Sequence, residues 1–201
     1  MAKLYFRHGV MSAAKTSNLL QVEFTYGQAG MKTILAKPAV DSKGGTSIVS
    51  RIGLKKEANL LISPEMNVKE ELQRILAENR EAGTPIACLL IDEAQFLSPK
   101  QVDQLLWLAV FEDLPVLAYG LRSDFLTQAF PGSARLLTIA HSIEEVKTVC
   151  PHDGSKALFN ARKTKDGEYI SDGGQVAIDG DGVEYESICP KCFMEKVVSL
   201  A

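Results

Sequence analysis

The sequence lacks long apolar runs and is poor in histidine and tryptophan. Only 3 His and 1 Trp occur among 201 residues. No window approaches the roughly 18 consecutive apolar residues of a membrane-spanning helix. The first residues also lack the basic and apolar segments of a secretory leader. The sequence therefore predicts neither secretion nor membrane insertion, and a cytoplasmic location is expected.

The sequence also lacks a concentrated run of Lys and Arg. Lys and Arg total 22 against 25 Asp and Glu, a formal net charge of −3, and no basic block is longer than Lys55-Lys56. Proteins that bind nucleic acid usually carry a concentrated patch of positive charge that faces the phosphates. A nucleic-acid partner is therefore not expected.

Cysteine is sparse, with 4 residues. Cys88 lies inside an apolar run, whereas Cys150, Cys189 and Cys192 lie near the end of the sequence. This uneven distribution disfavours a disulfide framework and favours a metal site in a reducing compartment.

The composition suits one globular core with a small appended unit, since 46% of the residues are apolar and 23% charged. Apolar patterning predicts an alternation of strands and helices, with loops over about 41–54 and 120–131. The expected strands are 4–6, 33–37, 86–91 and 116–119, and the expected helices are 15–29, 67–82, 99–112 and one starting near 132. Such an order is typical of an α/β fold with a parallel sheet.

A phosphate-binding loop is predicted between the first strand and the first helix. The full pattern G-x-x-x-x-G-K-[ST] directs backbone N–H groups and a lysine at phosphates and a hydroxyl at Mg²⁺. The matching residues are Gly9, Val10, Met11, Ser12, Ala13, Ala14, Lys15 and Thr16. Ala14 occupies the position of the second glycine, where a Cβ costs strain or affinity.

Asp92 and Glu93 follow the apolar run 86–91 directly. In open α/β sheets, ligands bind at the carboxyl ends of the strands, so both carboxylates are expected to face the phosphate loop. One would support Mg²⁺ and the other would act as a general base. The alternative is that the pair only caps the following helix.

Phe125 and Phe130 either line a pocket for a flat ring or anchor their loop to the core.

Beyond Val149 the helical periodicity fades, and short alternating runs appear at 175–178 and 184–188. The C-x-x-C at Cys189 and Cys192, together with Cys150, supplies three thiolates for a tetrahedral zinc site. The fourth ligand is either His152, which suits zinc chemically, or Asp153, which keeps the usual spacer.

Several blocks together resemble the cytosolic, zinc-containing (type II) thymidine kinases in their bacterial form. The blocks are LYFRHGVMSAAKT at 4–16, KPAVD at 37–41, VSRIGL at 49–54, IDEAQF at 91–96, YGLRSDF at 119–125, FPGSARLL at 130–137 and the cysteine-bearing tail. The resemblance implies a RecA-like P-loop domain over 1–147. It also implies a zinc-ribbon-like domain with a substrate-covering (lasso) loop over 148–201.

The resemblance also implies an activity: transfer of the ATP γ-phosphate to the 5′-hydroxyl of thymidine or deoxyuridine, in nucleotide salvage. It implies ATP, Mg²⁺ and Zn²⁺ as cofactors, a homotetramer, and feedback inhibition by dTTP.

The family pattern further assigns individual residues. Nucleotide contacts would come from the phosphate loop with Asp92, Glu93, Ala94 and Gln95, and Glu93 would be the base. Nucleoside contacts would come from Phe96, Leu121, Phe125, Phe130, Ile178, Gly180 and Tyr185. Charge support would come from Asp41, Arg51 and Lys43, which stands where the family has arginine.

Two other functions fit parts of the sequence. Ala14 and Lys43 suit a catalytically impaired nucleotide-binding homologue that acts as a sensor or structural partner. The tail alone suits a zinc-ribbon protein that binds nucleic acid, which the acidic balance disfavours. Retention of Lys15, Thr16 and the acidic pair favours an active enzyme.

Overall fold

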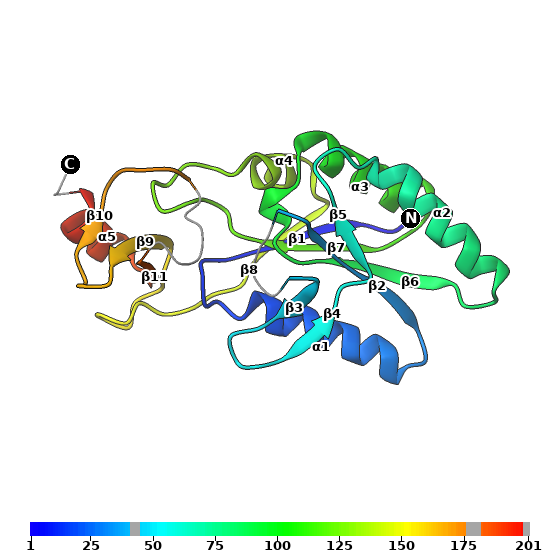
Figure 1. Ribbon diagram of the computed structural model, residues 1–201, viewed down its shortest axis with the longest axis horizontal. Coiled ribbons are helices and arrows are strands. Elements are labelled where there is room, and N and C mark those ends of the chain that lie inside the picture. The colour runs from blue at the N-terminus through cyan, green and yellow to red at the C-terminus, as the bar shows by residue number, and fades with distance from the viewer. Residues whose placement is uncertain (41–44, 176–181, 199–201) are drawn as a thin grey trace.

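The computed structural model describes residues 1–40, 45–175 and 182–198. Within these ranges the main sheet has six parallel strands in the order β5-β2-β6-β7-β1-β8 (Figure 1). Its strands are β1 Leu4–His8, β2 Lys32–Pro38, β5 Leu60–Ile62, β6 Ile86–Ile91, β7 Val116–Gly120 and β8 Ser142–Glu145. The predicted α/β class with a parallel sheet is confirmed.

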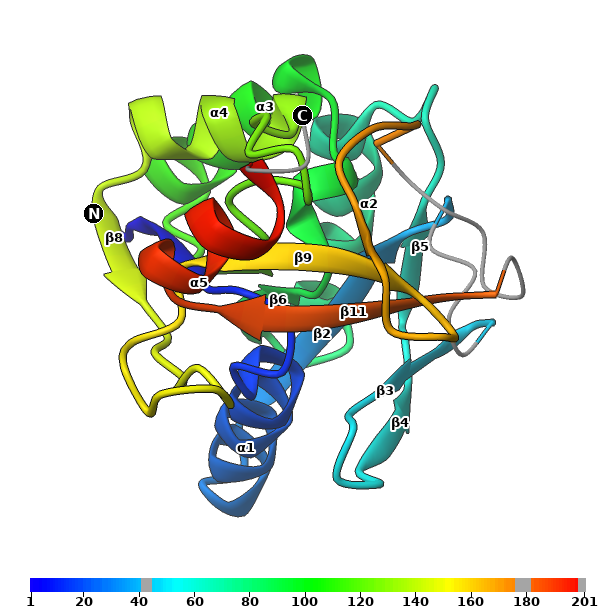
Figure 2. The ribbon, with the colours of Figure 1, turned by 90° about the vertical axis from the view of Figure 1, so that its left-hand side faces the viewer.

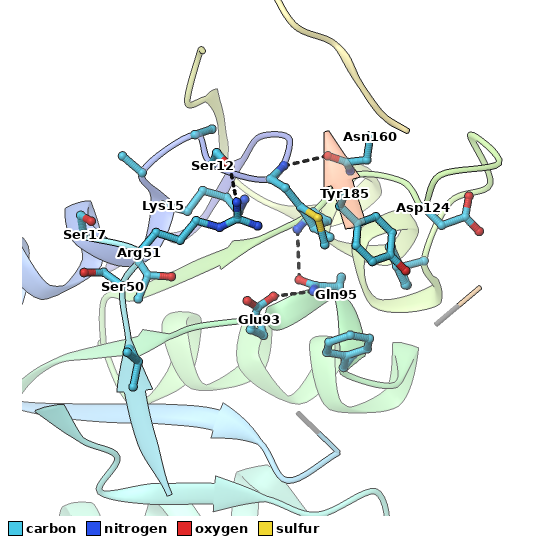
Figure 3. A pocket seen from close by; sticks show the side chains of 18 of the residues that line it. Ser12, Lys15, Ser17, Ser50, Arg51, Glu93, Gln95, Asp124, Asn160 and Tyr185 are labelled. Carbon is cyan, nitrogen blue, oxygen red and sulfur yellow. Dashed lines mark hydrogen bonds between the residues drawn. The ribbon is translucent and has the colours of Figure 1, made fainter. Parts of the chain in front are cut away.

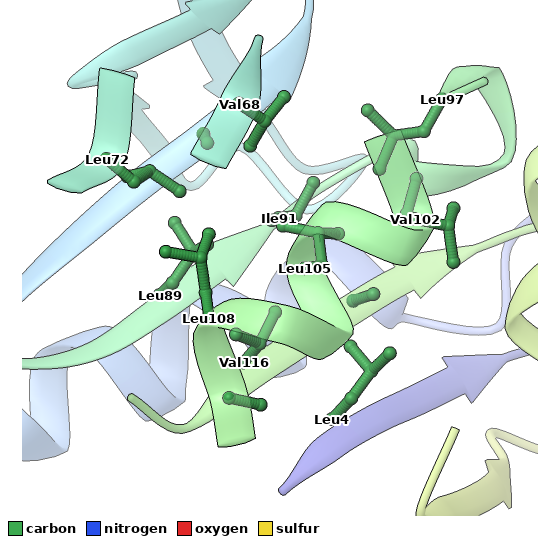
Figure 4. Close-up of a cluster of buried hydrophobic side chains, with 14 of the residues drawn as sticks. Leu4, Val68, Leu72, Leu89, Ile91, Leu97, Val102, Leu105, Leu108 and Val116 are labelled. Atoms are coloured by element: carbon green, nitrogen blue, oxygen red, sulfur yellow. The ribbon is translucent and has the colours of Figure 1, made fainter. Parts of the chain in front are cut away.

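Helices cover both faces of this sheet. Helix α1 (Lys15–Gln28) packs on one face, whereas α2 (Val68–Glu81), α3 (Pro99–Phe111) and α4 (Pro131–Ile139) pack on the other. Successive residues of a strand point to opposite faces. In β6, Leu89 and Ile91 therefore enter the larger core with α2 and α3 (Figure 4), while Leu90 meets α1.

The N-termini of α1, α2 and α3 differ in how they are capped. Ser98 and Gln101 form a capping box at α3, and Asn67 accepts a hydrogen bond from the Glu70 amide at α2. Helix α1 has no side-chain cap, because it begins after Ala14 in the phosphate loop. Its free N–H groups and positive dipole end are thus available to an anion.

The predicted strands and helices of the main domain are confirmed, but short elements were missed. Part of the predicted loop 41–54 forms a strand, β3 (Ser47–Val49), which pairs with β4 (Lys55–Glu57) in a hairpin. The edge strands β5 and β8 were not expected either. Each has only three or four residues, too few to show a period.

A smaller antiparallel sheet, in the order β10-β9-β11, lies beyond the carboxyl ends of the main strands (Figures 1 and 2). It consists of β9 (Phe159–Thr164), β10 (Tyr169–Ile170) and β11 (Val183–Ile188), followed by helix α5 (Pro190–Lys196). The predicted domain boundary after residue 147 falls between β8 and β9.

The small sheet has two different faces. Phe159, Ala161 and Ile188 pack with Phe193 of α5 and the three tail cysteines in a separate core. Asn160, Arg162 and Ser187, which alternate with them, instead contact residues of the main domain. None of the helices in the described ranges is long and apolar enough to cross a membrane.

Candidate active site and metal centre

A single cavity of about 540 Å³ brings most of the predicted site residues together (Figure 3). It lies at the carboxyl ends of β1, β6 and β7, between the phosphate loop, the β3–β4 hairpin and the small sheet. Its lining contains Met11, Ser12, Ala13, Ala14, Lys15, Thr16, Arg51, Glu93, Gln95, Phe96, Leu121, Phe125, Phe130 and Tyr185. Gly9, Val10, Asp92 and Ala94 do not line it.

The phosphate loop holds two non-glycine residues in the left-handed region, Ser12 (φ 60°) and Ala14 (φ 58°). Lys15 is 8% exposed, and its Nζ donates to the Val10 carbonyl at 2.8 Å. Burial lowers the pKa of the Lys15 ammonium. The negative charges of the nearby Glu93 and Asp92 carboxylates act in the opposite direction and raise it. The loop is therefore a preformed cradle whose lysine sits opposite two carboxylates.

Ala14→Gly tests the strain at this position. The left-handed conformation costs an alanine about 1–2 kcal/mol, partly offset by the extra entropy of an unfolded glycine, about 0.5–1 kcal/mol. We expect the thermal midpoint to rise by up to roughly 2–4 °C and the ATP KM to fall, because the exposed methyl lines the cavity. Calorimetry and ATP titration of turnover measure both. Unchanged or lower values would show that the loop has relaxed around Ala14.

Asp92 and Glu93 have distinct environments. Asp92 is 5% exposed and lies beside the Thr16 side chain, and burial, followed by the adjacent Glu93 charge, raises the pKa of Asp92. Glu93 is half-buried, has φ 50°, and faces the cavity. Neither carboxylate caps α3, because Ser98 does. The capping alternative is therefore not supported.

Gln95 fixes the Glu93 side chain. Its Nε2 donates to Glu93 Oε2 at 2.6 Å, and its Oε1 accepts from the Leu121 amide at 3.0 Å (Figure 3). Gln95 is only 1% exposed, and these two hydrogen bonds hold both ends of its amide. A side chain at position 120 would collide with this amide, since a Cβ on Gly120 would lie 2.7 Å from Gln95 Oε1.

Aromatic and apolar residues form the other end of the cavity. The Phe96 and Phe130 rings meet edge to face with centroids 5.7 Å apart. Phe125 and Phe130 are 1% and 5% exposed and also line the cavity, so they anchor their loop and form a wall at once. This end suits a flat, uncharged ring, whereas the loop end suits phosphates.

Two residues of the small sheet that the sequence did not single out contribute here. The guanidinium of Arg162 stacks on the Phe125 ring, with its Cζ 3.6 Å from the ring centroid. Its Nη2 donates to the Tyr185 hydroxyl at 2.7 Å. Asn160 lines the cavity and accepts from the Met11 amide. The alternation of apolar and polar residues at 159–162 was the available signal for this strand.

Arg51 reaches the phosphate loop from the hairpin side of the cavity. Its Nη1 donates to Ser12 Oγ at 2.7 Å, which places a guanidinium beside the expected phosphate site. The predicted site residues Asp41, Lys43, Ile178 and Gly180 lie outside the described residues. Their assignments stay predictions.

Four predicted metal ligands converge in the small domain. One ligand atom each from Cys150, Asp153, Cys189 and Cys192 lies within 4.8 Å of all the others. Ligands of a tetrahedral zinc with bonds of about 2.3 Å are about 3.8 Å apart, so three thiolates and a carboxylate fit Zn²⁺. The cluster is consistent with zinc.

His152 lies outside this cluster. Its Nε2 is 3.0 Å from Glu186 Oε2 and 3.1 Å from the Tyr169 hydroxyl, across the adjoining sheet. Asp153 instead places Oδ2 3.2 Å from Cys189 Sγ. The geometry favours Asp153 over His152 as the fourth ligand.

Metal analysis of two variants tests this choice. Asp153→Ala should reduce the bound zinc well below one per chain, because the site loses one of its four ligands. His152→Ala is the matched control and should retain zinc. Elemental analysis after dialysis against a weak chelator measures both. Equal loss in the two variants, or no zinc in the unmodified protein, would contradict the assignment.

Comparisons with known proteins point to one family. A family model described as "Thymidine kinase" matches residues 2–193. A protein named thymidine kinase from Ruegeria pomeroyi is 43% identical over 196 residues, which covers 97% of this chain and 95% of the relative. Those from Mannheimia succiniciproducens and Enterobacteria phage T4 are each 41% identical, over 201 and 196 residues. They cover 100% and 97% of this chain, and 99% and 97% of the relatives.

Proposed function

Because this chain belongs to the thymidine kinase family and is an ATP-dependent thymidine kinase, we propose that the cavity described above is where the γ-phosphate passes to the 5′-hydroxyl of thymidine or deoxyuridine. The observation that carries the proposal is the shared cavity. A loop with a buried lysine forms one end, aromatic rings form the other, and Glu93 lies between them. An impaired homologue would not need this complete arrangement.

Phosphoryl transfer depends mainly on positioning and charge neutralisation. In the proposed complex, the N–H groups of the phosphate loop, Lys15 and Arg51 hold the ATP phosphates. Thr16 and Asp92, whose side chains lie next to each other, are the residues that would support Mg²⁺. When bound, the ion would neutralise charge on the β- and γ-phosphates.

Glu93 is the proposed general base that takes the proton of the 5′-hydroxyl. Gln95 acts as a positioning residue, because it holds one carboxylate oxygen and leaves the other for the substrate. The left-handed backbone at Glu93 is a strained conformation of the kind that clusters at functional sites. Phe96, Phe125, Phe130 and Tyr185 would enclose the nucleobase. Arg162 braces two of these rings, those of Phe125 and Tyr185.

We further propose that the enzyme works in the cytoplasm as a homotetramer inhibited by dTTP. Family membership motivates these assignments. A feedback inhibitor that combines thymine with a triphosphate would suit the cavity, since its two ends match those two groups. Sedimentation velocity and dTTP inhibition curves test the two properties.

A nucleoside panel tests the proposed substrate. Thymidine, deoxyuridine, deoxycytidine and deoxyguanosine are supplied separately with ATP and Mg²⁺, and ADP release is measured. Thymidine and deoxyuridine should give the highest kcat/KM, because their bases suit the small aromatic end. Equal rates for all four, or a preference for deoxyguanosine, would contradict the proposal.

A further inference from the structure

The backbone of Met11, at the tip of the phosphate loop, is held on both sides by the small sheet. Its N–H donates to Asn160 Oδ1 at 2.8 Å (Figure 3), and its carbonyl accepts from Ser187 Oγ at 2.5 Å. Asn160 Nδ2 donates in turn to the Ser123 carbonyl, so its amide orientation is fixed at both ends. Asn160 is 4% exposed and Ser187 8%.

The two side chains form one structural unit. Ser187 of β11 lies directly opposite Asn160 of β9, and Tyr185 lies opposite Arg162 two residues along. These four side chains belong to the alternate set that faces the main domain. The other set packs on α5 and the cysteine cluster. One face of the small sheet therefore contacts both the phosphate loop and the aromatic end of the cavity.

The phosphate loop has a physical need for such support. Ser12 and Ala14, the first and third residues after Met11, both adopt a left-handed backbone conformation although neither is glycine. Strained conformations of this kind persist only where the surroundings enforce them. Within the loop, the amide of Ala13 reaches the Val10 carbonyl only at 3.4 Å. The contacts to Met11 therefore fix the part of the loop that precedes the strained positions.

We propose that Asn160 and Ser187 are positioning residues through which the small domain holds the phosphate loop in its ATP-accepting shape. The small domain thus supports ATP binding directly, in addition to any role in covering the nucleoside. The inference rests on the proposed role of residues 9–16 in binding phosphates. It assigns a function to two side chains of the tail that are not among the four residues of the metal cluster.

The test is the affinity for a non-hydrolysable ATP analogue with Mg²⁺, measured by calorimetry without nucleoside. Asn160→Leu keeps the side-chain shape and removes both hydrogen bonds, and Ser187→Ala removes one. Each should weaken analogue binding roughly 3- to 10-fold, the scale of a lost buried hydrogen bond. Ser187 does not line the cavity, so Ser187→Ala should leave the thymidine dissociation constant within about twofold.

Controls separate positioning from unfolding. Thr164 lies on the same strand as Asn160, and its hydroxyl accepts a hydrogen bond from the Glu168 amide in the turn after β9. Thr164→Ala removes this bond, which does not involve the phosphate loop, and should leave analogue affinity unchanged. Adding Ala14→Gly to either variant should recover much of the lost affinity, because a loop with less strain needs less support. Unchanged analogue affinity in both Asn160→Leu and Ser187→Ala would overturn the proposal. Lys15→Met in the same titration reports separately on the phosphate-loop assignment.

Discussion

Replacing Glu93 with glutamine is expected to lower kcat by roughly 10²–10⁴-fold, the usual contribution of a general base. The amide keeps the size of the side chain and an oxygen that can accept from Gln95 Nε2, so the geometry of the site should persist. It cannot take the proton of the 5′-hydroxyl. Thymidine and ATP dissociation constants should therefore change little, and stopped-flow and steady-state assays of ADP release measure the loss.

Glu81→Gln is the matched control for this variant. It makes the same chemical change at an exposed residue of α2, outside the cavity lining, and should keep full activity. If Glu93→Gln retains more than about half of the turnover, Glu93 is not the base. A loss of thymidine binding equal to the loss of rate would instead assign Glu93 a role in binding.

Replacing Lys15 with methionine should reduce turnover by roughly 10²–10³-fold, the scale of removing one preorganised charge partner of the transition state. Lys15 is buried beside Asp92 and Glu93, and its ammonium is the cationic group of the phosphate loop. Methionine preserves the length and fills the space, so the loss reports on charge. Analogue binding should weaken as well, because ground-state phosphates lose the same contact.

Two comparisons make this prediction specific. Lys100→Met changes an exposed lysine at the start of α3 and should leave turnover unchanged. Lys15→Arg keeps the charge but replaces a compact ammonium with a planar fork, so it should rescue only part of the rate. Near-normal turnover in Lys15→Met would remove the phosphate loop from the mechanism.

The main features of the fold could be predicted because strong local patterns specify them. The run 86–91 is apolar without interruption, as expected of a strand covered on both faces, and it forms β6. The capping signals of α2 and α3 are likewise local. Edge strands such as β8, with the sequence SIEE, were missed because only pairing with β1 gives them their structure.

The tail was less predictable for a related reason. Helix α5 has seven residues, too few to show a period, and its N-cap is the Cys189 side chain, which accepts from the Cys192 amide. Its stability depends on tertiary contacts and on the cysteine cluster. The sequence offered both His152 and Asp153 as the fourth ligand, and only the positions of Glu186 and Tyr169 explain why His152 points elsewhere.

The candidate site was predicted from motifs, but the groups that orient it were not. Glu93 and Lys15 could be identified from their spacing and their place after strands. Arg162 and Asn160 act through partners that are distant in sequence, namely Phe125 and Met11. No local pattern records such a pairing, because it arises when the small sheet meets the main domain.

We propose that one cavity joins ATP and thymidine for transfer to the 5′-oxygen. Phosphorus NMR of the reaction of the unmodified protein with ATP, Mg²⁺ and thymidine tests it most directly. We expect one thymidine 5′-monophosphate for each ADP formed, and no ADP above background when thymidine is omitted. Thymidine-independent ADP release, or a phosphate ester at the 3′-oxygen, would contradict it.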